Sequence, residues 1–90
     1  MHVAVLGAGT MGHGIAQVTA MAGHDVWMRD IEREFVDDGL DAIESNLQGG
    51  VDRDKVTEDE MTATLDRLSG TTSLEEAVAD ADFVIEAVPE

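Results

Sequence analysis

The chain has 90 residues, no cysteine, and 20 Asp and Glu residues against 5 Lys and Arg, for a formal net charge of −15. This length allows one small domain, the acidity disfavours nucleic acid as a partner, and the missing cysteines exclude disulfides and thiolate metal sites. No apolar run approaches the roughly 20 residues that cross a membrane, and the start shows no signal peptide. We therefore expect a soluble cytoplasmic protein without a membrane partner.

The acidic residues are spread along the chain and alternate with periodic apolar residues, so they do not form a disordered acidic tail. Lys55 is the one lysine. An acidic, lysine-poor surface is typical of proteins from salt-accumulating halophiles, in which salt screens the self-repulsion. We expect a halophilic origin, with an ordinary acidic protein as the alternative.

The first thirty residues carry the most informative pattern. Residues 2–6 predict a buried strand, residues 10–22 a helix ended by Gly23, and residues 25–29 a second strand. A Gly-x-Gly-x-x-Gly turn joins the first strand to the helix, which is the arrangement of a dinucleotide-binding βαβ unit. Gly7 would allow the tight turn, and Gly9 would let a pyrophosphate approach the backbone. Gly12 would let the helix pack closely on the strand.

Asp30 follows the second strand and lies 23 residues after Gly7, close to the offset of roughly 20 at which an acid binds the adenosine ribose. An acid at this position repels a 2′-phosphate and therefore favours NAD over NADP. Arg29 and Arg33 lie nearby and keep NADP as the alternative. A purely structural alternative for Asp30 is to cap the following helix.

Periodicity predicts the remaining elements. In the first helix we expect a buried stripe of Met11, Ile15, Val18 and Ala22. Residues 31–48 predict a long helix with a buried stripe of Val36, Leu40, Ile43 and Leu47, broken by Gly49-Gly50.

Two capping-box patterns then begin at Thr57 and Ser73. The first predicts a helix with an apolar face of Met61, Leu65 and Leu68, and the second a short helix to about Ala79. Residues 70–72 predict a weak strand and residues 83–88 a fourth strand, ended by Pro89.

This element order predicts an α/β fold: a partial, Rossmann-type, doubly wound parallel sheet with strand order 3-2-1-4 and a helical insertion after strand 2. Residues 1–90 would form the N-terminal portion of a dinucleotide-binding domain. The three histidines have no metal-site spacing, so no metal is expected.

Two motifs at opposite ends of the chain resemble those of the 3-hydroxyacyl-CoA dehydrogenases. One is Val5-Leu6-Gly7-Ala8-Gly9-Thr10-Met11-Gly12-His13-Gly14-Ile15-Ala16-Gln17, and the other is Asp82-Phe83-Val84-Ile85-Glu86-Ala87-Val88-Pro89-Glu90. Ala22-Gly23-His24-Asp25-Val26 and Arg29-Asp30-Ile31 continue the resemblance between them. This family oxidises the 3-hydroxyl of an acyl-CoA and passes hydride to NAD.

The resemblance implies an NAD site made of Gly7, Ala8, Gly9, Thr10, Met11, Gly12, Asp30, Ala87, Val88 and Glu90. It also implies an acyl-CoA substrate and a homodimer for the intact enzyme. The family's catalytic histidine and glutamate lie downstream of the last motif, so no residue of this chain is expected to be catalytic, and the substrate and dimerisation domain is absent from it. The alternatives are a stand-alone dinucleotide-binding or redox-sensing module, and another NAD-dependent β-hydroxyacid dehydrogenase.

Overall fold

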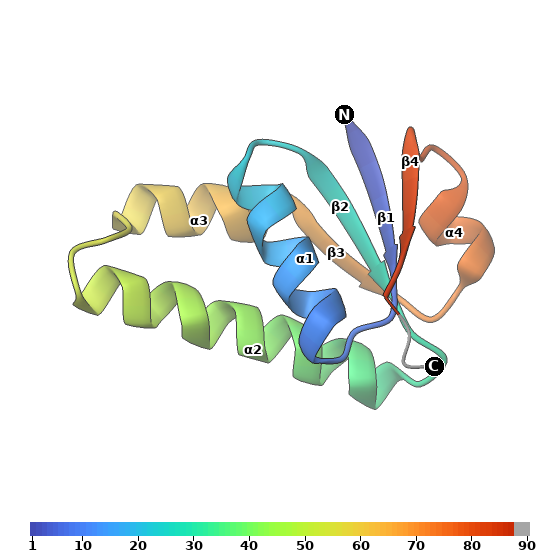
Figure 1. The fold of residues 1–90 in the computed structure, drawn as a ribbon, viewed down its shortest axis with the longest axis horizontal. Helices are drawn as coiled ribbons and strands as arrows, with labels where there is room; N and C mark the ends of the chain where they lie inside the picture. Colours follow the sequence, from blue (N-terminus) through green and yellow to red (C-terminus); the bar gives the residue numbers. More distant parts are fainter. Residues whose placement is uncertain (88–90) are drawn as a thin grey trace.

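A parallel four-stranded sheet separates two layers of helices in the computed structural model, which describes residues 1–87 (Figure 1). The strands are β1 (His2–Leu6), β2 (Asp25–Arg29), β3 (Leu68–Thr71) and β4 (Phe83–Glu86). They lie in the order β3-β2-β1-β4, and every pair is parallel. The predicted fold class and strand order are confirmed.

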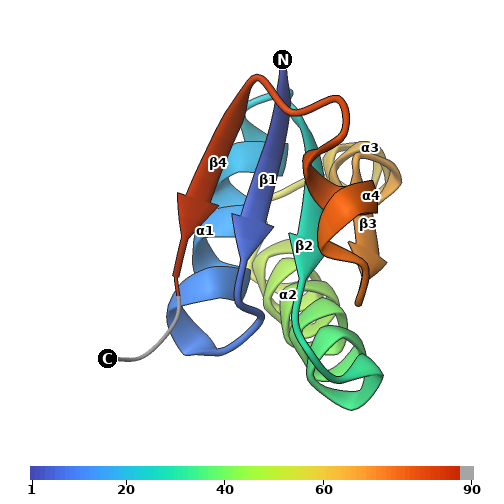
Figure 2. The same ribbon diagram turned by 90° about the vertical axis from the view of Figure 1, so that its right-hand side faces the viewer.

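Four helices connect the strands: α1 (Thr10–Met21), α2 (Arg33–Asp52), α3 (Glu58–Asp66) and α4 (Leu74–Val78). Figure 2 shows α4 in front of the sheet and α1, α2 and α3 behind it. The pair α2 and α3 forms the predicted helical insertion between β2 and β3. The carboxyl ends of the parallel strands β1, β2 and β4 lie beside the start of α1 (Figure 1).

The core lies between the sheet and the layer of α1 and α2. Alternate residues of β1 and β2 point into it, and α2 contributes its predicted stripe. Among the buried members are Val3, Val5, Val26, Met28, Ile43 and Leu47, with Leu40 packed against them. The predicted stripe of α2 is therefore confirmed, because Val36 is also fully buried.

The predicted buried stripe of α1 is wrong for Met11, Val18 and Ala22, whereas Ile15 is partly buried and packs against the core. Met11 is 68% exposed and Val18 is 62% exposed, whereas the buried residues of this helix are Gly12, Ala16 and Ala20. These three are spaced four apart and form one helical face. Small side chains let α1 approach the sheet closely, so most of the large apolar residues in the sequence pattern lie outside the buried face of the helix.

The predicted break at Gly49-Gly50 is also wrong, because α2 continues through both glycines to Asp52. Gly50 is buried, and a Cβ at this position would lie 2.9 Å from Cγ2 of Val56. The glycine therefore permits close packing of the α2–α3 connection instead of ending the helix. The chain turns after Arg53, at Asp54, which has a φ of 58°.

The later elements differ from the predictions mainly at their boundaries. Leu68, expected on the apolar face of α3, begins β3 instead, and β3 ends at Thr71. Met61 and Leu65 do pack against the core. β4 ends at Glu86, although the Ala87 N–H donates to the Leu6 carbonyl oxygen at 2.8 Å and extends the contact with β1.

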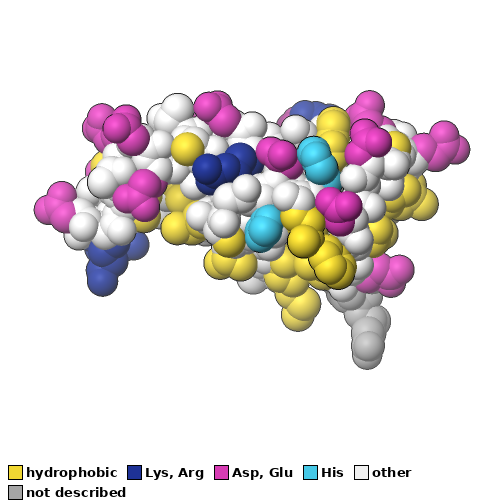
Figure 3. Space-filling view, turned by 90° about the horizontal axis from the view of Figure 1, so that it is seen from above, with side chains coloured by type: hydrophobic (Ala, Val, Ile, Leu, Met, Phe, Trp, Pro, Cys, Tyr) yellow, Lys and Arg dark blue, Asp and Glu magenta, His cyan; other side chains and the backbone are white. Residues whose placement is uncertain are grey.

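Acidic side chains are distributed over the surface. Figure 3 looks at the end of the molecule where β1 begins and shows Asp and Glu scattered across it, with few Lys or Arg side chains among them. In residues 1–87 no helix is long and apolar enough to cross a membrane.

Candidate dinucleotide site

A tight turn joins β1 to α1, and two glycines make it possible. Gly7 has a φ of 118°, which favours glycine, and its N–H donates to the Arg29 carbonyl oxygen of the neighbouring strand at 2.7 Å. A Cβ on Gly12 would collide with the carbonyl oxygen of Gly7. The first turn of α1 therefore packs directly on the backbone of the turn that precedes it.

Gly9 is the N-cap of α1 and leaves the start of this helix open. No side chain of the described residues accepts a hydrogen bond at this end of α1, and its first turn contains no acid. A Cβ built on Gly9 would meet no atom within 4 Å. The first N–H groups of a helix lack intrahelical partners and attract anions. The turn thus offers donors, positive potential and empty space for a phosphate group.

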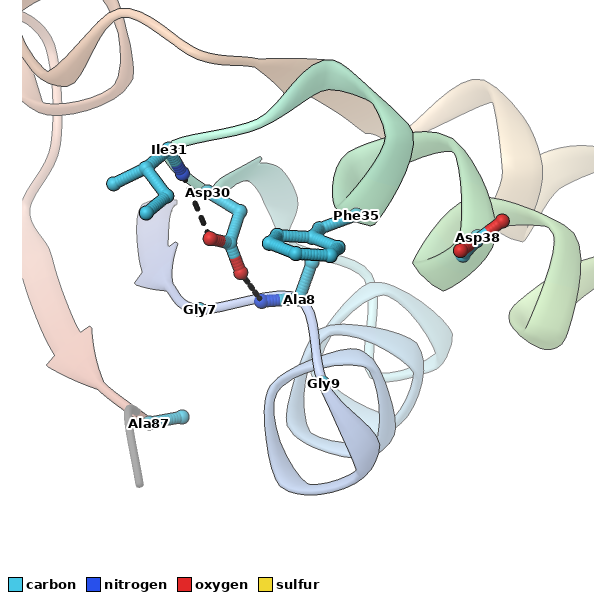
Figure 4. A pocket seen from close by; sticks show the side chains of 8 residues that line it. All are labelled: Gly7, Ala8, Gly9, Asp30, Ile31, Phe35, Asp38 and Ala87. Carbon is cyan, nitrogen blue, oxygen red and sulfur yellow. Dashed lines mark hydrogen bonds between the residues drawn. The ribbon is translucent and has the colours of Figure 1, made fainter. Parts of the chain in front are cut away.

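Asp30 stands at the end of β2 and faces this turn (Figure 4). Its Oδ2 atom accepts a hydrogen bond from the Ala8 N–H at 2.9 Å, and its Oδ1 atom accepts one from the Ile31 N–H at 2.7 Å. The N-cap of α2 is Glu32, so the capping alternative for Asp30 is wrong. The carboxylate instead links the end of β2 to the glycine turn.

A cavity of about 480 Å³ lies beside these residues. It brings together five of the predicted residues: Gly7, Ala8, Gly9, Asp30 and Ala87. Thr10, Met11 and Gly12 occupy the first turn of α1, next to the cavity lining. Val88 and Glu90 lie outside the described residues.

The cavity is also lined by three residues outside the predicted site: Ile31, Phe35 and Asp38. Ile31 is 68% exposed and Phe35 is 46% exposed. A signal for Phe35 was present, because this aromatic residue falls outside the stripe of α2 that packs on the core. Large apolar side chains that remain exposed beside polar groups are typical of ligand sites.

Arg29 and Arg33, the two residues that could favour NADP, form hydrogen bonds on the β3 side of the molecule. Arg29 Nε donates to the Thr72 carbonyl oxygen at 3.0 Å. Arg33 Nε donates to Oδ1 of Asp37 at 3.0 Å, and its Nη1 donates to the Gly70 carbonyl oxygen at 3.1 Å. Neither arginine lines the cavity, so the described lining carries carboxylates without a cation.

These features fit NAD. The open N-terminus of α1 suits the pyrophosphate, the carboxylate of Asp30 suits ribose hydroxyls, and exposed Ile31 and Phe35 suit the apolar faces of adenosine. The described lining of the cavity contains no histidine.

Comparisons with known proteins agree with this geometry. The family model described as "3-hydroxyacyl-CoA dehydrogenase, NAD binding domain" matches residues 2–90. The chain is 46% identical over 88 residues to a 3-hydroxyadipyl-CoA dehydrogenase of Escherichia coli K12, covering 98% of this chain and 18% of that protein. It is 42% identical over 86 residues to the fatty acid oxidation complex subunit alpha of Idiomarina loihiensis, covering 96% and 12%.

Among solved structures, a 3-hydroxybutyryl-CoA dehydrogenase from Escherichia coli K12 superposes with a TM-score of 0.95 at 44% identity. The match covers 100% of this chain and 19% of that one. The chain thus spans a minor part of each of these relatives. Sequence, fold and site agree on one assignment: the chain belongs to the NAD-binding domain family of the 3-hydroxyacyl-CoA dehydrogenases.

Proposed function

We propose that the protein containing this chain is an oxidoreductase that converts a 3-hydroxyacyl-CoA to a 3-oxoacyl-CoA, and that this chain is its NAD-binding part. The observation that carries the proposal is the Asp30 carboxylate, hydrogen-bonded to the Ala8 N–H of the glycine turn and facing the same cavity. When bound, NAD supplies the acceptor for the hydride that leaves C3 of the substrate.

The described residues have separate tasks in this proposal. The N–H groups at the start of α1 bind the pyrophosphate, with Gly9 leaving room for it. Asp30 accepts hydrogen bonds from the adenosine ribose, and Ile31 and Phe35 contact the adenosine. We expect the nicotinamide toward the end of β4, near Ala87, which lines the same cavity.

The acyl-CoA substrate is proposed from the relatives, whose names refer to 3-hydroxyadipyl-CoA, 3-hydroxybutyryl-CoA and fatty acid oxidation. Matches above 40% identity that extend over nearly the whole chain favour this activity over a stand-alone nucleotide-binding module. By the same reasoning we propose a role in β-oxidation. A homodimer is proposed on the family resemblance alone, and sedimentation velocity of the full-length gene product tests it.

The experiment for the activity is NADH-dependent reduction of acetoacetyl-CoA by the full-length gene product, followed by NADH absorbance. We expect turnover with NADH, and weaker turnover or none with NADPH. A small 3-oxo acid without CoA, acetoacetate, serves as the competing substrate. Turnover of that acid without turnover of the thioester would contradict the acyl-CoA assignment and favour another β-hydroxyacid dehydrogenase.

The site assignment is tested by Asp30→Ala. Charge-assisted hydrogen bonds contribute about 1.5–3 kcal/mol each, so NADH affinity should fall by at least tenfold, and discrimination against NADPH should shrink. Asp25→Ala is the matched control, because Asp25 lies at the other end of β2 and pairs with His2 at 3.9 Å on the surface. An unchanged ratio of NADH to NADPH affinity in Asp30→Ala would contradict the assignment.

We also propose a halophilic origin, supported by the formal net charge of −15 and the single lysine. Salt shortens the Debye length from about 10 Å at 0.1 M to about 3 Å at 1 M, which weakens repulsion among the acids and between them and the anionic dinucleotide. Thermal unfolding midpoints and NADH affinity should both rise with KCl. A midpoint that stays flat or falls over this range identifies an ordinary acidic protein.

We propose a cytoplasmic location from composition, because disulfides are typical of oxidising compartments and this chain has no cysteine to form one. Cell fractionation with an antibody against the full-length gene product tests this location.

A further inference from the structure

The start of α2 lies against the glycine turn, and Gly39 makes this approach possible. A Cβ on Gly39 would lie 2.8 Å from the carbonyl oxygen of Ala8 and 2.8 Å from Cε of Met28. The residue before it, Asp38, is consequently fixed near the turn and lines the same cavity as Asp30. Figure 4 shows Asp38 on α2, beyond Phe35.

Asp38 is exposed, and no hydrogen bond or ion pair within residues 1–87 engages its carboxylate. It thus adds a second negative charge to a cavity whose described lining has no cation. Asp30 differs, because its two carboxylate oxygens already accept hydrogen bonds from Ala8 and Ile31. The neighbouring Asp37 is also different, since it holds Arg33 on the side of Gly70, away from the cavity.

We propose that Asp38 is a second specificity-determining residue, which acts with Asp30 to exclude a dinucleotide with a 2′-phosphate. Asp37 is a positioning residue in the same arrangement, because its exposed ion pair with Arg33 competes with that phosphate for the guanidinium. The inference rests on the proposed dinucleotide site. Asp37 and Asp38 on α2 then set the preference for NAD over NADP together with Asp30 after β2.

The physical basis is electrostatic. A 2′-phosphate carries close to two negative charges, and a carboxylate beside the same cavity repels it more than it repels a neutral ribose hydroxyl. An arginine near this site is the residue that accommodates a 2′-phosphate in NADP-binding relatives of the fold. Arg33 is the arginine close in sequence to Asp30. Because its guanidinium donates to Asp37 and Gly70, it would have to leave these partners to contact a 2′-phosphate.

The first test compares Asp38→Asn with Asp52→Asn in the full-length gene product, by fluorescence titration with NADH and with NADPH at one KCl concentration. Both variants lose one charge from α2, but fourteen residues separate them, which is about 21 Å along a helix. The preference for NADH over NADPH should fall about threefold to tenfold in Asp38→Asn. It should stay unchanged in Asp52→Asn. NADH affinity should also rise in Asp38→Asn, because the pyrophosphate of NADH is anionic, but by less than NADPH affinity rises.

The second test is a double-mutant cycle of Asp37→Asn and Arg33→Gln. Asp37→Asn should increase NADPH affinity, because it frees Arg33, and the increase should disappear when Arg33→Gln is added. Asp37→Glu should restore the parental preference. A merely structural role of Asp37 would change NADH and NADPH affinity equally.

The outcomes separate this inference from the proposed function. If the parent binds NADH but Asp38→Asn keeps the parental preference, the inference is overturned and the NAD site stands. If Asp52→Asn loosens the preference as much as Asp38→Asn does, the effect comes from overall charge and the inference is likewise overturned. Binding of neither dinucleotide to the parent would overturn both.

Discussion

The N-termini of α1 and α3 are built in opposite ways. At α3, the Thr57 hydroxyl accepts from the Glu60 N–H at 3.1 Å and the Glu60 carboxylate accepts from the Thr57 N–H at 3.1 Å, which completes a capping box. At α1, Gly9 provides no side-chain cap, and the first turn has no acid. One helix satisfies its own terminal donors, and the other leaves them available.

This difference distinguishes a structural helix end from a binding one. A side-chain cap contributes about 1 kcal/mol to stability, and α1 lacks that contribution at the place where the dinucleotide pyrophosphate is expected. α2 also lacks a side-chain cap, but it carries Glu34 in its first turn and so places its own negative charge there. The combination of no cap, no acid and open space occurs at α1.

The largest expected effect comes from Gly12→Ala. Its Cβ would collide with the Gly7 carbonyl oxygen, which is backbone and cannot rotate away. The free energy of unfolding should fall by about 1–3 kcal/mol, and NADH binding should be lost because the turn must move. Urea denaturation and NADH titration measure the two effects.

Gly14→Ala is the matched control for that variant, since a Cβ at Gly14 meets no atom within 4 Å. Alanine is favoured over glycine inside a helix by about 0.5–1 kcal/mol, so this change should raise stability and leave NADH affinity intact. Equal damage from both variants would mean that glycine content in general, rather than the contact with Gly7, matters in α1.

Gly9→Ser converts the open helix end into a capped one. The site has room for the side chain, and serine caps a helix better than glycine by a few tenths of a kcal/mol. Stability should therefore hold or rise slightly, while NADH affinity should fall about tenfold, equal to about 1.4 kcal/mol, as the hydroxyl occupies phosphate space. An unchanged affinity would show that the pyrophosphate does not approach Gly9.

Thr57→Ala removes the cap of α3 and should have the smallest effect of the three on the site. The free energy of unfolding should fall by about 1 kcal/mol, with NADH affinity unchanged within error. Thr57→Ser should restore the parental stability because it keeps the hydroxyl. A loss of NADH affinity in Thr57→Ala would contradict the separation of structural and binding helix ends.

Much of this architecture could be predicted because its signals are local. The glycine turn, the cap at Thr57 and the position of Asp30 each follow from a short pattern, and the strand order follows from the order of these elements along the chain. The stripe of α2 was equally clear, since Val36, Ile43 and Leu47 must be buried for this long helix to pack.

The errors share a different cause, namely contacts between segments far apart in the sequence. Gly50 looked like a helix breaker but accommodates Val56, and the small residues of α1 are buried because the helix lies close to the sheet. The roles of Phe35 and Asp38 in the cavity depend on how α2 lies against the glycine turn. Such close approaches are set by tertiary packing and leave little periodic signal.

The two hydrogen bonds of Asp30 also have an entropic consequence. Its carboxylate is held at Ala8 and Ile31 before any ribose arrives, so its rotamer is fixed when the chain folds. Immobilising a free side chain at an interface costs about 0.5–1.5 kcal/mol, and a ribose that meets Asp30 avoids this cost. Each carboxylate oxygen retains a further lone pair for a hydroxyl, so the residue can receive the cofactor without reorganising the turn that it supports.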